Sequence, residues 1–414
     1  MKETRFKYTE VGKIPEEWNI EPIGNLFIFK NGLNKAKSFF GYGTPIVNYT
    51  DVYNHRGIKK QDINGLVCLS HDEISRYLVK DGDVFFTRTS ETPEEVGLTS
   101  VLLEDIPNCS FSGFVLRARP INGKINKYYC QYCFSAQLIR KLIINSCTYT
   151  TRALTNGGVL SRIPLCIPPL SEQTRIASAL TSVDNLLTSL GKLIEKKRAI
   201  KQGAMQMLLT GKKRLKGFEG EWVEKKLGEI GSKYAYGVSA EAVSYNGSDK
   251  YIRITDIDEE SHRYNPIPLV SPAFYSENHL VEENDVLVAR TGASVGKTYW
   301  YDKNDGKLIF AGFLMKFHVE NDCSKYVFYS MCSNRYKQWV LSESMRSGQP
   351  GLNLEQLKSF LLLLPSPSEQ TRIASVLTSM DNEITALEAK KKKYEAIKQG
   401  MMQQLLTGRI RLVD

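Results

Sequence analysis

Ser171-Glu-Gln-Thr-Arg-Ile-Ala-Ser178 returns unchanged as Ser368-Glu-Gln-Thr-Arg-Ile-Ala-Ser375, 197 positions further along the chain. Lys201-Gln-Gly203 returns at 398–400 with the same offset, so no gap separates the copies. The offset is nearly half of the 414 residues, which identifies a tandem duplication. A duplicated chain can fold with internal twofold symmetry, and a DNA duplex is a common soluble ligand with that symmetry.

Each copy predicts one long helix. Prolines at 168, 169, 365 and 367 end the preceding segments, and Ser171 and Ser368 are the expected N-caps. An acidic residue then follows in each first turn, where the helix dipole favours it. The Thr-Gly pairs at 210–211 and 407–408 predict glycine stops.

Apolar residues follow steps of four and three along both predicted helices, the pattern of a coiled-coil seam. Because the matching partner lies in the same chain, twofold symmetry would make the helices antiparallel. About 38 residues at ~1.5 Å each give a rod of roughly 57 Å. The predicted interhelix seam consists of Ile176, Leu180, Val183, Leu187, Leu190, Ile194, Ile373, Leu377, Met380, Ile384 and Leu387.

Two globular segments, about 14–165 and 217–364, precede the helices and have diverged further. They still share landmarks: an Arg-Thr pair ends a strand-like run at 82–89 and again at 284–291. Phe111-Ser-Gly-Phe114 likewise parallels Phe310-Ala-Gly-Phe313. Short alternating runs, with helical stretches at 127–145 and 325–343, predict mixed strands and helices. The fold class is therefore α+β: two mixed α/β domains separated by two long antiparallel coiled-coil helices, with internal pseudo-twofold symmetry.

The net charge of +10 is concentrated in the repeats. Residues 171–216 hold ten Lys/Arg and three Asp/Glu, and residues 368–411 hold eight and five. Lysine clusters at 196–198 and 390–393 could contact phosphate, lie in solvent or bind another protein. No run of 18 apolar residues and no signal peptide is visible, so we expect a cytoplasmic protein without a membrane partner.

Motifs for catalysis are weak. Gly292-Ala-Ser-Val-Gly-Lys-Thr298 has three residues between its glycines where a P-loop needs four, and a strand-like run follows it. Asn265-Pro-Ile-Pro268 departs from the methyltransferase motif that it partly matches. The histidines are scattered, and Cys130 and Cys133 lack a second metal-binding pair. We therefore expect no catalytic, cofactor-binding or metal-binding residues in this chain.

Binding residues are better indicated. Arginine can pair bidentately with guanine, and threonine can reach phosphate or a thymine methyl group. The Arg-Thr pairs recur at strand ends, and polar loops with an arginine recur at 148–152 and 344–349. Each arginine could equally be an ordinary surface ion-pair residue. The candidate DNA-binding residues are Arg88, Thr89, Ser90, Arg152, Arg290, Thr291, Lys297, Arg346 and Gln349.

Over its whole length the chain resembles specificity subunits of type I restriction–modification systems. The resemblance is carried by Pro169-Leu-Ser-Glu-Gln-Thr-Arg-Ile-Ala177, by its copy at 367–374, and by the Lys-Gln-Gly-x-Met-Gln-x-Leu-Leu-Thr-Gly stretches at 201–211 and 398–408. It implies target-recognition domains at 1–167 and 213–364 and conserved spacer helices at 168–212 and 365–414.

The resemblance also implies partners. Each recognition domain would read one half of an asymmetric bipartite site in double-stranded DNA. The subunit itself would be non-catalytic. It would bind two modification subunits that use S-adenosylmethionine, and through them restriction subunits that use ATP and Mg²⁺.

Two other functions stay open on the residues alone. Heptads and basic charge would also suit a coiled-coil interaction scaffold without DNA readout. The near-motifs at 265 and 292 would be the basis for an enzyme acting alone, such as an ATPase or methyltransferase.

Overall fold

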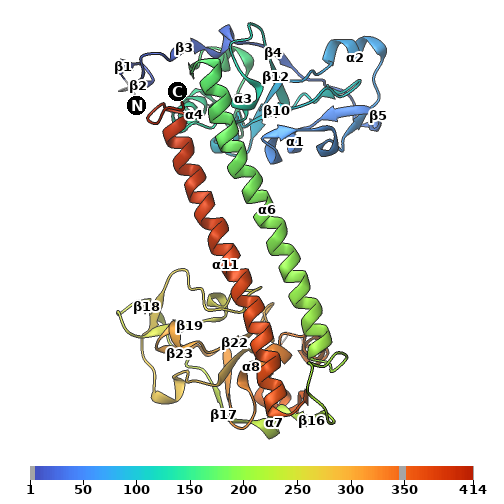
Figure 1. The fold of residues 1–414 in the computed structure, drawn as a ribbon, viewed down its shortest axis with the longest axis vertical. Helices are drawn as coiled ribbons and strands as arrows, with labels where there is room; N and C mark the ends of the chain where they lie inside the picture. Colours follow the sequence, from blue (N-terminus) through green and yellow to red (C-terminus); the bar gives the residue numbers. More distant parts are fainter. Residues whose placement is uncertain (1–4, 345–350, 414) are drawn as a thin grey trace. The chain divides into compact units, whose positions relative to one another are not determined.

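The computed structural model describes residues 5–344 and 351–413, which form two compact units (Figure 1). Unit 1 comprises Met1–Ser189 and Lys391–Asp414, and unit 2 comprises Leu190–Lys390. Two 39-residue helices, α6 (Leu170–Leu208) and α11 (Pro367–Leu405), are each shared between the units. Each unit therefore contains the start of one helix and the end of the other.

The two helices begin earlier than the sequence suggested. The backbone carbonyl of Pro169 accepts the amide of Gln173, and that of Ser366 accepts the amide of Gln370, both at 2.9 Å. Ser171 and Ser368 are thus inside the first turns, and their prediction as N-caps is wrong. Pro367 takes the first helical position, where a missing N–H costs nothing. Gly211 and Gly408 adopt positive φ after the helix ends, as their stop role predicts.

Unit 1 is a mixed α/β domain built on a five-stranded sheet of order β4-β12-β8-β10-β6. Its strands pair antiparallel, except that β10 and β6 are parallel. The predicted helical stretch at 127–145 forms α3 and α4. The strands are β1 (Phe6–Thr9), β2 (Gly12–Pro15), β3 (Asn19–Pro22), β4 (Phe27–Asn31), β5 (Phe40–Val47), β6 (Gly57–Ile58), β7 (Leu66–Val67), β8 (Val84–Thr87), β9 (Thr89–Ser90), β10 (Thr99–Leu102), β11 (Ser110–Phe111), β12 (Val115–Pro120), β13 (Thr148–Tyr149), β14 (Ala153–Leu154) and β15 (Pro164–Ile167), and the shorter helices are α1 (Tyr49–Asn54), α2 (His71–Tyr77), α3 (Lys127–Cys133), α4 (Gln137–Ser146) and α5 (Gly157–Leu160).

Unit 2 is built on a four-stranded antiparallel sheet of order β17-β24-β21-β22. Two helices again follow the sheet in the chain, where the sequence predicted one stretch at 325–343. The strands are β16 (Val223–Lys226), β17 (Gly231–Tyr236), β18 (Ala242–Ser244), β19 (Lys250–Ile252), β20 (Val270–Pro272), β21 (Asp285–Ala289), β22 (Thr298–Trp300), β23 (Leu308–Phe310), β24 (Leu314–Val319) and β25 (Leu361–Leu364), and the shorter helices are α7 (Leu227–Ile230), α8 (Ser324–Ser330), α9 (Asn334–Ser344) and α10 (Leu354–Ser359).

The two sheets share one frame despite their different sequences. β4-β12-β8-β10 of unit 1 corresponds in order to β17-β24-β21-β22 of unit 2. A parallel pair lies beside each frame, β5 with β11 in unit 1 and β19 with β23 in unit 2. The Arg-Thr pairs follow equivalent central strands, β8 and β21. The duplication has therefore kept the architecture that positions those residues.

The repeated Glu-Gln pair explains why the signature was retained in both copies. In unit 1 the carboxylate of Glu172 is buried and pairs with Arg411, at 2.7 Å from Nε. In unit 2 the buried carboxylate of Glu369 pairs with Arg214, at 2.6 Å from Nη2. Each acid at the start of one helix thus holds an arginine that follows the end of the other helix.

The glutamine of the signature fixes each helix to its domain. The Gln173 side chain accepts the amide of Asn126 and donates to the carbonyls of Lys124 and Pro168. The Gln370 side chain likewise accepts the amide of Cys323 and donates to the carbonyl of Pro365. Both glutamine side chains are buried and cannot reach water, so these hydrogen bonds satisfy polar groups that would otherwise have no partner.

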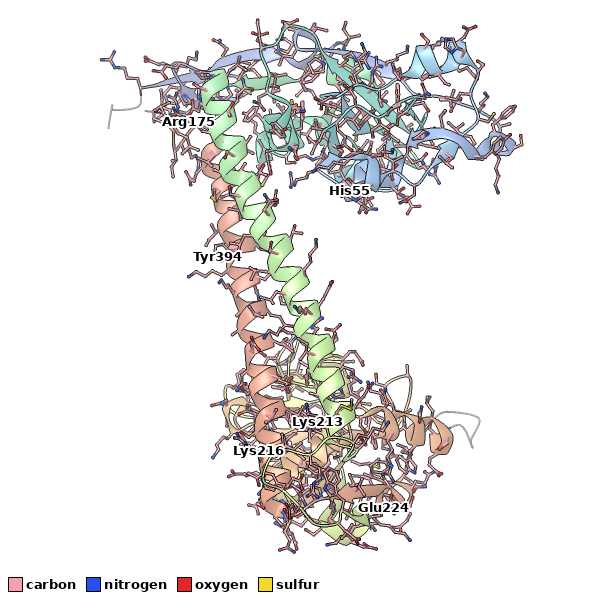
Figure 2. The ribbon with its side chains drawn as sticks, turned by 45° about the vertical axis from the view of Figure 1, so that its right-hand side comes forward. His55, Arg175, Lys213, Lys216, Glu224 and Tyr394 are labelled. Atoms are coloured by element: carbon pink, nitrogen blue, oxygen red, sulfur yellow. The ribbon has the colours of Figure 1, made fainter. Side chains whose placement is uncertain are left out.

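Pairing between the two helices is antiparallel within each unit. In unit 1 the guanidinium of Arg175, which Figure 2 labels near the start of α6, donates to the carbonyl of Leu412 at 3.1 Å. Asp184 of α6 pairs with Lys398 of α11. In unit 2 Lys201 pairs with Asp381 at 2.5 Å. Residue numbers therefore increase along α6 in the direction in which they decrease along α11.

Several predicted seam residues pack into the domain cores as well as towards the other helix. Ile176 and Leu180 join the core of unit 1 together with Met402 and Leu405. Ile373 and Leu377 join the core of unit 2 in the same way. Leu190, Ile194 and Ile384 are also buried, whereas Val183, Leu187, Met380 and Leu387 are half-buried.

Candidate functional site

The Arg-Thr pairs lie at the ends of the central strands, at equivalent places in the two units. The backbone amide of Arg88 donates to the carbonyl of Phe114, and that of Arg290 donates to the carbonyl of Phe313, each at 3.0 Å. Both bonds tie the strand end to the turn before the neighbouring strand. The arginine backbone is thus fixed while its side chain stays half-buried.

Residues that follow the second predicted loop in each unit hydrogen-bond to the same arginines. The amide of Thr155 donates to the carbonyl of Arg88 at 3.0 Å, and the amide of Leu352 donates to that of Arg290 at 2.8 Å. The structure therefore brings the Arg-Thr pair and the exit of the polar loop together in both units. Arg346 and Gln349, which belong to the loop of unit 2, lie outside the described residues.

In unit 1 these elements surround a surface pocket of about 370 Å³. Arg152 is exposed at its edge and forms no ion pair with any residue that the structure describes. The rings of Tyr49 and Tyr53 stack with centroids 5.9 Å apart. Planar rings, a guanidinium and hydroxyls in one concave place suit base edges and phosphates. The lining residues are Tyr49, Tyr53, Thr89, Ser90, Glu91, Glu95, Phe114 and Arg152.

In unit 2 the arginine is held differently. The guanidinium of Arg290 lies over the ring of Tyr236, 4.7 Å from its centroid. Its Nε atom is buried and makes no hydrogen bond with the described residues. Thr291 is half-buried beside it and bridges to Gly351. The stack orients the guanidinium, and the unpaired Nε adds a cost in solvation.

Two predicted candidates have internal roles instead. The hydroxyl of Ser90 is buried and donates to Glu95 at 2.8 Å. The ammonium group of Lys297 is buried, donates to the carbonyls of Ile254 and Ile257, and pairs with Glu259 at 2.6 Å. These contacts occupy the polar atoms that would otherwise bind DNA, so we leave Ser90 and Lys297 out of the proposed DNA-reading residues.

A buried acid braces the central strands under each site. In unit 1 Asp83 accepts two hydrogen bonds of 2.7 Å from Arg119, and this pairing raises the pKa of Arg119. In unit 2 the equivalent Asp285 lies 2.9 Å from His318 and 3.4 Å from Lys316. Both acids also accept a backbone amide of the preceding turn. The strands that carry the Arg-Thr pairs are therefore rigidly held.

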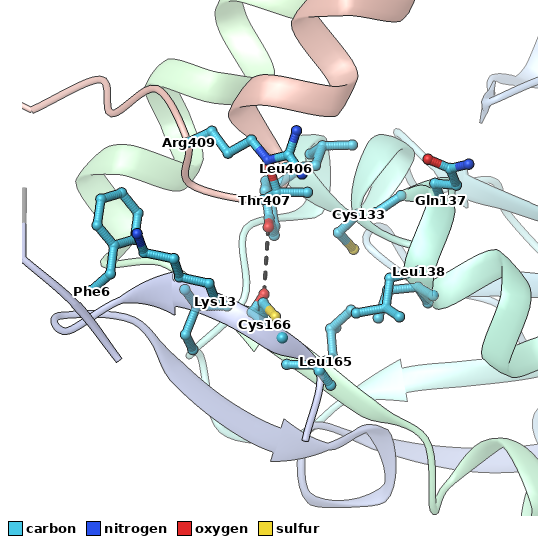
Figure 3. Close-up of a pocket in the computed structure, with 16 residues that line it drawn as sticks. Phe6, Lys13, Cys133, Gln137, Leu138, Leu165, Cys166, Leu406, Thr407 and Arg409 are labelled. Carbon is cyan, nitrogen blue, oxygen red and sulfur yellow. Dashed lines mark hydrogen bonds between the residues drawn. The ribbon is translucent and has the colours of Figure 1, made fainter. Parts of the chain in front are cut away.

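A second pair of equivalent pockets lies where the helix ends meet the domains. The pocket of unit 1, about 530 Å³, is drawn in Figure 3 and includes Leu165, Leu406 and Arg409 in its lining. The pocket of unit 2, about 170 Å³, is lined by Leu209, Lys212 and Leu362 among others. Leu406 and Arg409 are the repeat counterparts of Leu209 and Lys212. Each pocket thus combines an apolar floor with a basic side chain at its edge.

The near-motif at 292–298 is a loop between the antiparallel strands β21 and β22, as the sequence predicted. A P-loop must open a helix so that backbone amides point at phosphate, and this loop enters a strand. Over residues 5–344 and 351–413, no cluster of three metal-ligating side chains is found. No helix in those same ranges is long and apolar enough to cross a membrane.

Exposed aromatic side chains beside the Arg-Thr pairs are the feature that sequence reasoning missed. Phe114 and Phe313 were noted as landmarks of the duplication, and their exposure was not foreseen. Tyr236 was also missed, because its place under Arg290 depends on residues 54 positions apart. The available signal was a large apolar residue directly after a glycine turn, repeated in both halves.

Comparison with known proteins gives a consistent result. A family model described as the type I restriction modification DNA specificity domain matches residues 15–202 and again residues 219–399. The chain is 27% identical to a protein of Methanocaldococcus jannaschii named as the MjaX specificity subunit of a type I restriction enzyme, covering 99% of this chain and 98% of the relative. It is 23% identical to the MjaVIII specificity subunit of the same organism, covering 99% and 97%.

Solved structures share the fold. The S subunit of a type I restriction–modification system from M. genitalium aligns with a TM-score of 0.60 at 14% identity, covering 94% of this chain and 96% of that one. A chain from a study of assembly and conformational transition in a type I system aligns with a TM-score of 0.59 at 15% identity, covering 96% and 99%.

Proposed function

Because the chain belongs to the type I restriction–modification DNA specificity family, we propose that its two units each read one half of an asymmetric bipartite DNA site. Sequence recognition is the known role of this family, and its members of this kind are not the catalytic subunits. The proposed reading residues are Arg88, Thr89 and Arg152 in unit 1 and Arg290 and Thr291 in unit 2. Arg346 and Gln349 stay candidates on sequence alone.

One observation carries the proposal: equivalent strand ends present an Arg-Thr pair on the same backbone frame while the surrounding surfaces differ. In unit 1 the pair opens on a tyrosine-lined pocket with Arg152, and in unit 2 the arginine stacks on Tyr236. A constant frame fixes position on the duplex, and different side chains select different bases. The two half-sites should accordingly have unlike sequences.

We further propose that the repeated helices form an antiparallel coiled-coil spacer, 168–212 with 365–414, between recognition domains at 1–167 and 213–364. The antiparallel ion pairs within each unit support this arrangement. The spacer would dock two modification subunits carrying S-adenosylmethionine, and through them restriction subunits using ATP and Mg²⁺. Because DNA is the substrate of the whole complex, we propose that this chain acts in the cytoplasm.

The helix-end pockets support a partner that binds twice. Two identical modification subunits need two similar docking places, and the apolar floors and basic rims recur at the repeat offset. The lysine clusters are less informative, since Lys197 and Arg198 pair internally with Glu383 and Glu388. A partner surface with acidic and apolar side chains would suit these pockets.

The test is selection of bound DNA from a random duplex pool by the chain together with its modification subunits. We expect enrichment of two short unlike sequences separated by a fixed gap. Arg88→Ala should relax preference in one half and Arg290→Ala in the other, each by roughly 5- to 150-fold at the affected base. Selection of no sequence at all would favour a scaffold without DNA readout.

A further inference from the structure

Each unit displays one phenylalanine at the same place beside its Arg-Thr pair. Phe114 is 62% exposed and Phe313 is 65% exposed. Each follows a glycine in the turn that leads into the central sheet, before β12 in unit 1 and before β24 in unit 2. The residues two positions before them, Ser112 and Ala311, are buried. The chain thus turns outward at the same point twice.

The backbone of both phenylalanines is fixed by three kinds of hydrogen bond. The amide of Val115 donates to the carbonyl of Ser112 at 3.1 Å, and that of Leu314 to the carbonyl of Ala311 at 2.8 Å, which closes a tight turn around each ring. The phenylalanine carbonyls accept the arginine amides already described. A neighbouring segment adds two further bonds through Leu33 in unit 1 and Val238 in unit 2.

That neighbouring segment approaches so closely that it requires glycine in both units. A Cβ atom on Gly32 would collide with the carbonyl oxygen of Ser112, and one on Gly237 would collide with that of Ala311. The turns are therefore held by the same close contact, although most surrounding residues differ. Such a turn is pre-organised, so its central side chain loses little backbone freedom when it meets a ligand.

Folding does not explain the choice of phenylalanine at this position. Turn centres are usually occupied by glycine, asparagine, aspartate or serine, whose reasons are conformational. A ring that is about two-thirds exposed gains little from burial, and a single exposed apolar residue would be unremarkable. Recurrence at one point of two diverged domains, next to the proposed reading arginines, calls for a common use.

We propose that Phe114 and Phe313 are paired base-contacting residues, each making an apolar contact with bases of its own half-site. The inference rests on the proposed function and names side chains that it did not include. A phenyl ring has no hydrogen-bonding atoms, so it selects bases through a thymine methyl group or through an exposed base face. Phe114 also lines the pocket that contains Thr89 and Arg152, which places the ring within the candidate interface.

The test uses the chain with its modification subunits and the bipartite site selected by the wild-type complex. Phe114→Ala should relax preference at one or two positions of one half-site, and Phe313→Ala should do so in the other half-site. We expect about tenfold weaker discrimination at those positions. Phe114→Leu and Phe313→Leu should restore much of it, because they return apolar surface at the same turn.

A matched control is Phe274→Ala, which removes a phenylalanine of similar exposure, 63%, from unit 2 without a counterpart in unit 1. It should leave both half-sites unchanged. Replacing each thymine of the site by uracil then separates the two contact modes. If the methyl group is read, uracil weakens wild-type binding and has no further effect in the alanine variant. If the base face is read, uracil has little effect on either protein.

The outcomes separate the inference from the proposed function. A wild-type complex that selects no sequence overturns both. A wild-type complex that selects a gapped site, with alanine variants that keep the full preference in both halves, overturns only the role of the phenylalanines. Equal loss in both half-sites from one substitution would also overturn it, because that pattern indicates damage to the frame.

Discussion

Unit 1 and unit 2 solve the same structural problem with different side chains. Both brace the central strands with a buried aspartate, but Asp83 pairs with Arg119 and Arg117 whereas Asp285 pairs with His318 and Lys316. Both anchor a tyrosine hydroxyl on an aspartate of the long helix. Among the described residues, their candidate reading surfaces share an Arg-Thr pair and one exposed phenylalanine. Duplication has thus preserved the frame that holds the candidate surfaces, while side chains on those surfaces have changed.

The helix-end ion pairs show the same contrast in energetic terms. Glu172 accepts four hydrogen bonds in unit 1: two from Arg411, one from the indole of Trp18 at 2.9 Å and one from the backbone amide of Leu412 at 3.4 Å. Glu369 of unit 2 has Arg214, whereas the indole nitrogen of the equivalent Trp222 is buried without a partner among the described residues. Arg411 also lies deeper, with 7% of its side chain exposed against 26% for Arg214.

The largest expected effect follows from breaking the deeper pair. Arg411→Ala should lower the free energy of unfolding of unit 1 by about 3 kcal/mol, because it leaves a buried carboxylate without a cationic partner, with only the Trp18 indole and a long bond from the Leu412 amide. Arg214→Ala should act in the same direction on unit 2, and more weakly because water reaches its guanidinium. Hydrogen–deuterium exchange resolves the two units in one experiment. Arg409→Ala, an exposed arginine nearby, is the control; protection of unit 1 that survives Arg411→Ala would refute the prediction.

How far the sequence predicts the fold depends on the range of the interactions involved. The heptad steps and prolines gave both long helices, because helix periodicity is local. The N-caps were placed too late, at Ser171 and Ser368, which lie inside helices that begin at Leu170 and Pro367. The seam was predicted as helix against helix, yet Ile176 and Ile373 also fill domain cores. An apolar stripe does not specify which surface covers it.

The site was predicted in part for a similar reason. Recurrence of Arg-Thr after a strand is visible in the sequence, and the structure places both pairs equivalently. The internal partners of Ser90 and Lys297 were not visible in the sequence, because they depend on the fold: Glu95 for Ser90, and the carbonyls of Ile254 and Ile257 for Lys297. Burial by distant residues has no local signature.

A second prediction concerns the stack of Arg290 on Tyr236, for which the described part of unit 1 has no counterpart at Arg88. Tyr236→Ala should weaken discrimination in the half-site read by Arg290 by about 1 kcal/mol, since it removes the ring that orients the guanidinium. Tyr236→Phe keeps the ring and loses only the hydroxyl that accepts the Leu354 amide, so it should stay close to wild type. Binding to single-base variants of the selected site measures both. An effect spread over both half-sites would contradict the assignment of Arg290 to one of them.

A third prediction tests whether the anchoring tyrosines are truly equivalent. Tyr132 donates to Asp184 at 2.8 Å and Tyr329 donates to Asp381 at 2.7 Å. Burial raises the pKa of both hydroxyls, so both are protonated donors at neutral pH. Tyr132→Phe and Tyr329→Phe should each cost about 1 kcal/mol of stability in their own unit. Urea titration with exchange measurements compares them, and clearly unequal costs would limit the equivalence to geometry.

The smallest expected effect belongs to unit 2 alone and depends on pH. His262 lies 2.8 Å from the carbonyl of Thr298 and packs edge-on against Phe328. Burial lowers the pKa of His262, because the charged ring would lose water. In the unfolded chain the His262 ring binds a proton near pH 6.5, whereas in the folded chain it does so only at lower pH. The contribution of His262 to the free energy of unfolding is therefore present above pH 6.5 and is lost as the pH falls below it.

His262→Gln should remove this part of the pH dependence, since the amide can still donate to Thr298 and does not titrate. Urea midpoints at pH 7.5 and 5.5, followed by the fluorescence of Trp222, Trp300 and Trp339 in unit 2, provide the comparison. The urea midpoint of the wild type should fall more between the two pH values than that of the variant. The corresponding difference in the free energy of unfolding should be smaller than the loss caused by either tyrosine substitution. Parallel slopes for the two proteins would mean that the folded unit accommodates the charged ring, and that His262 contributes through packing alone.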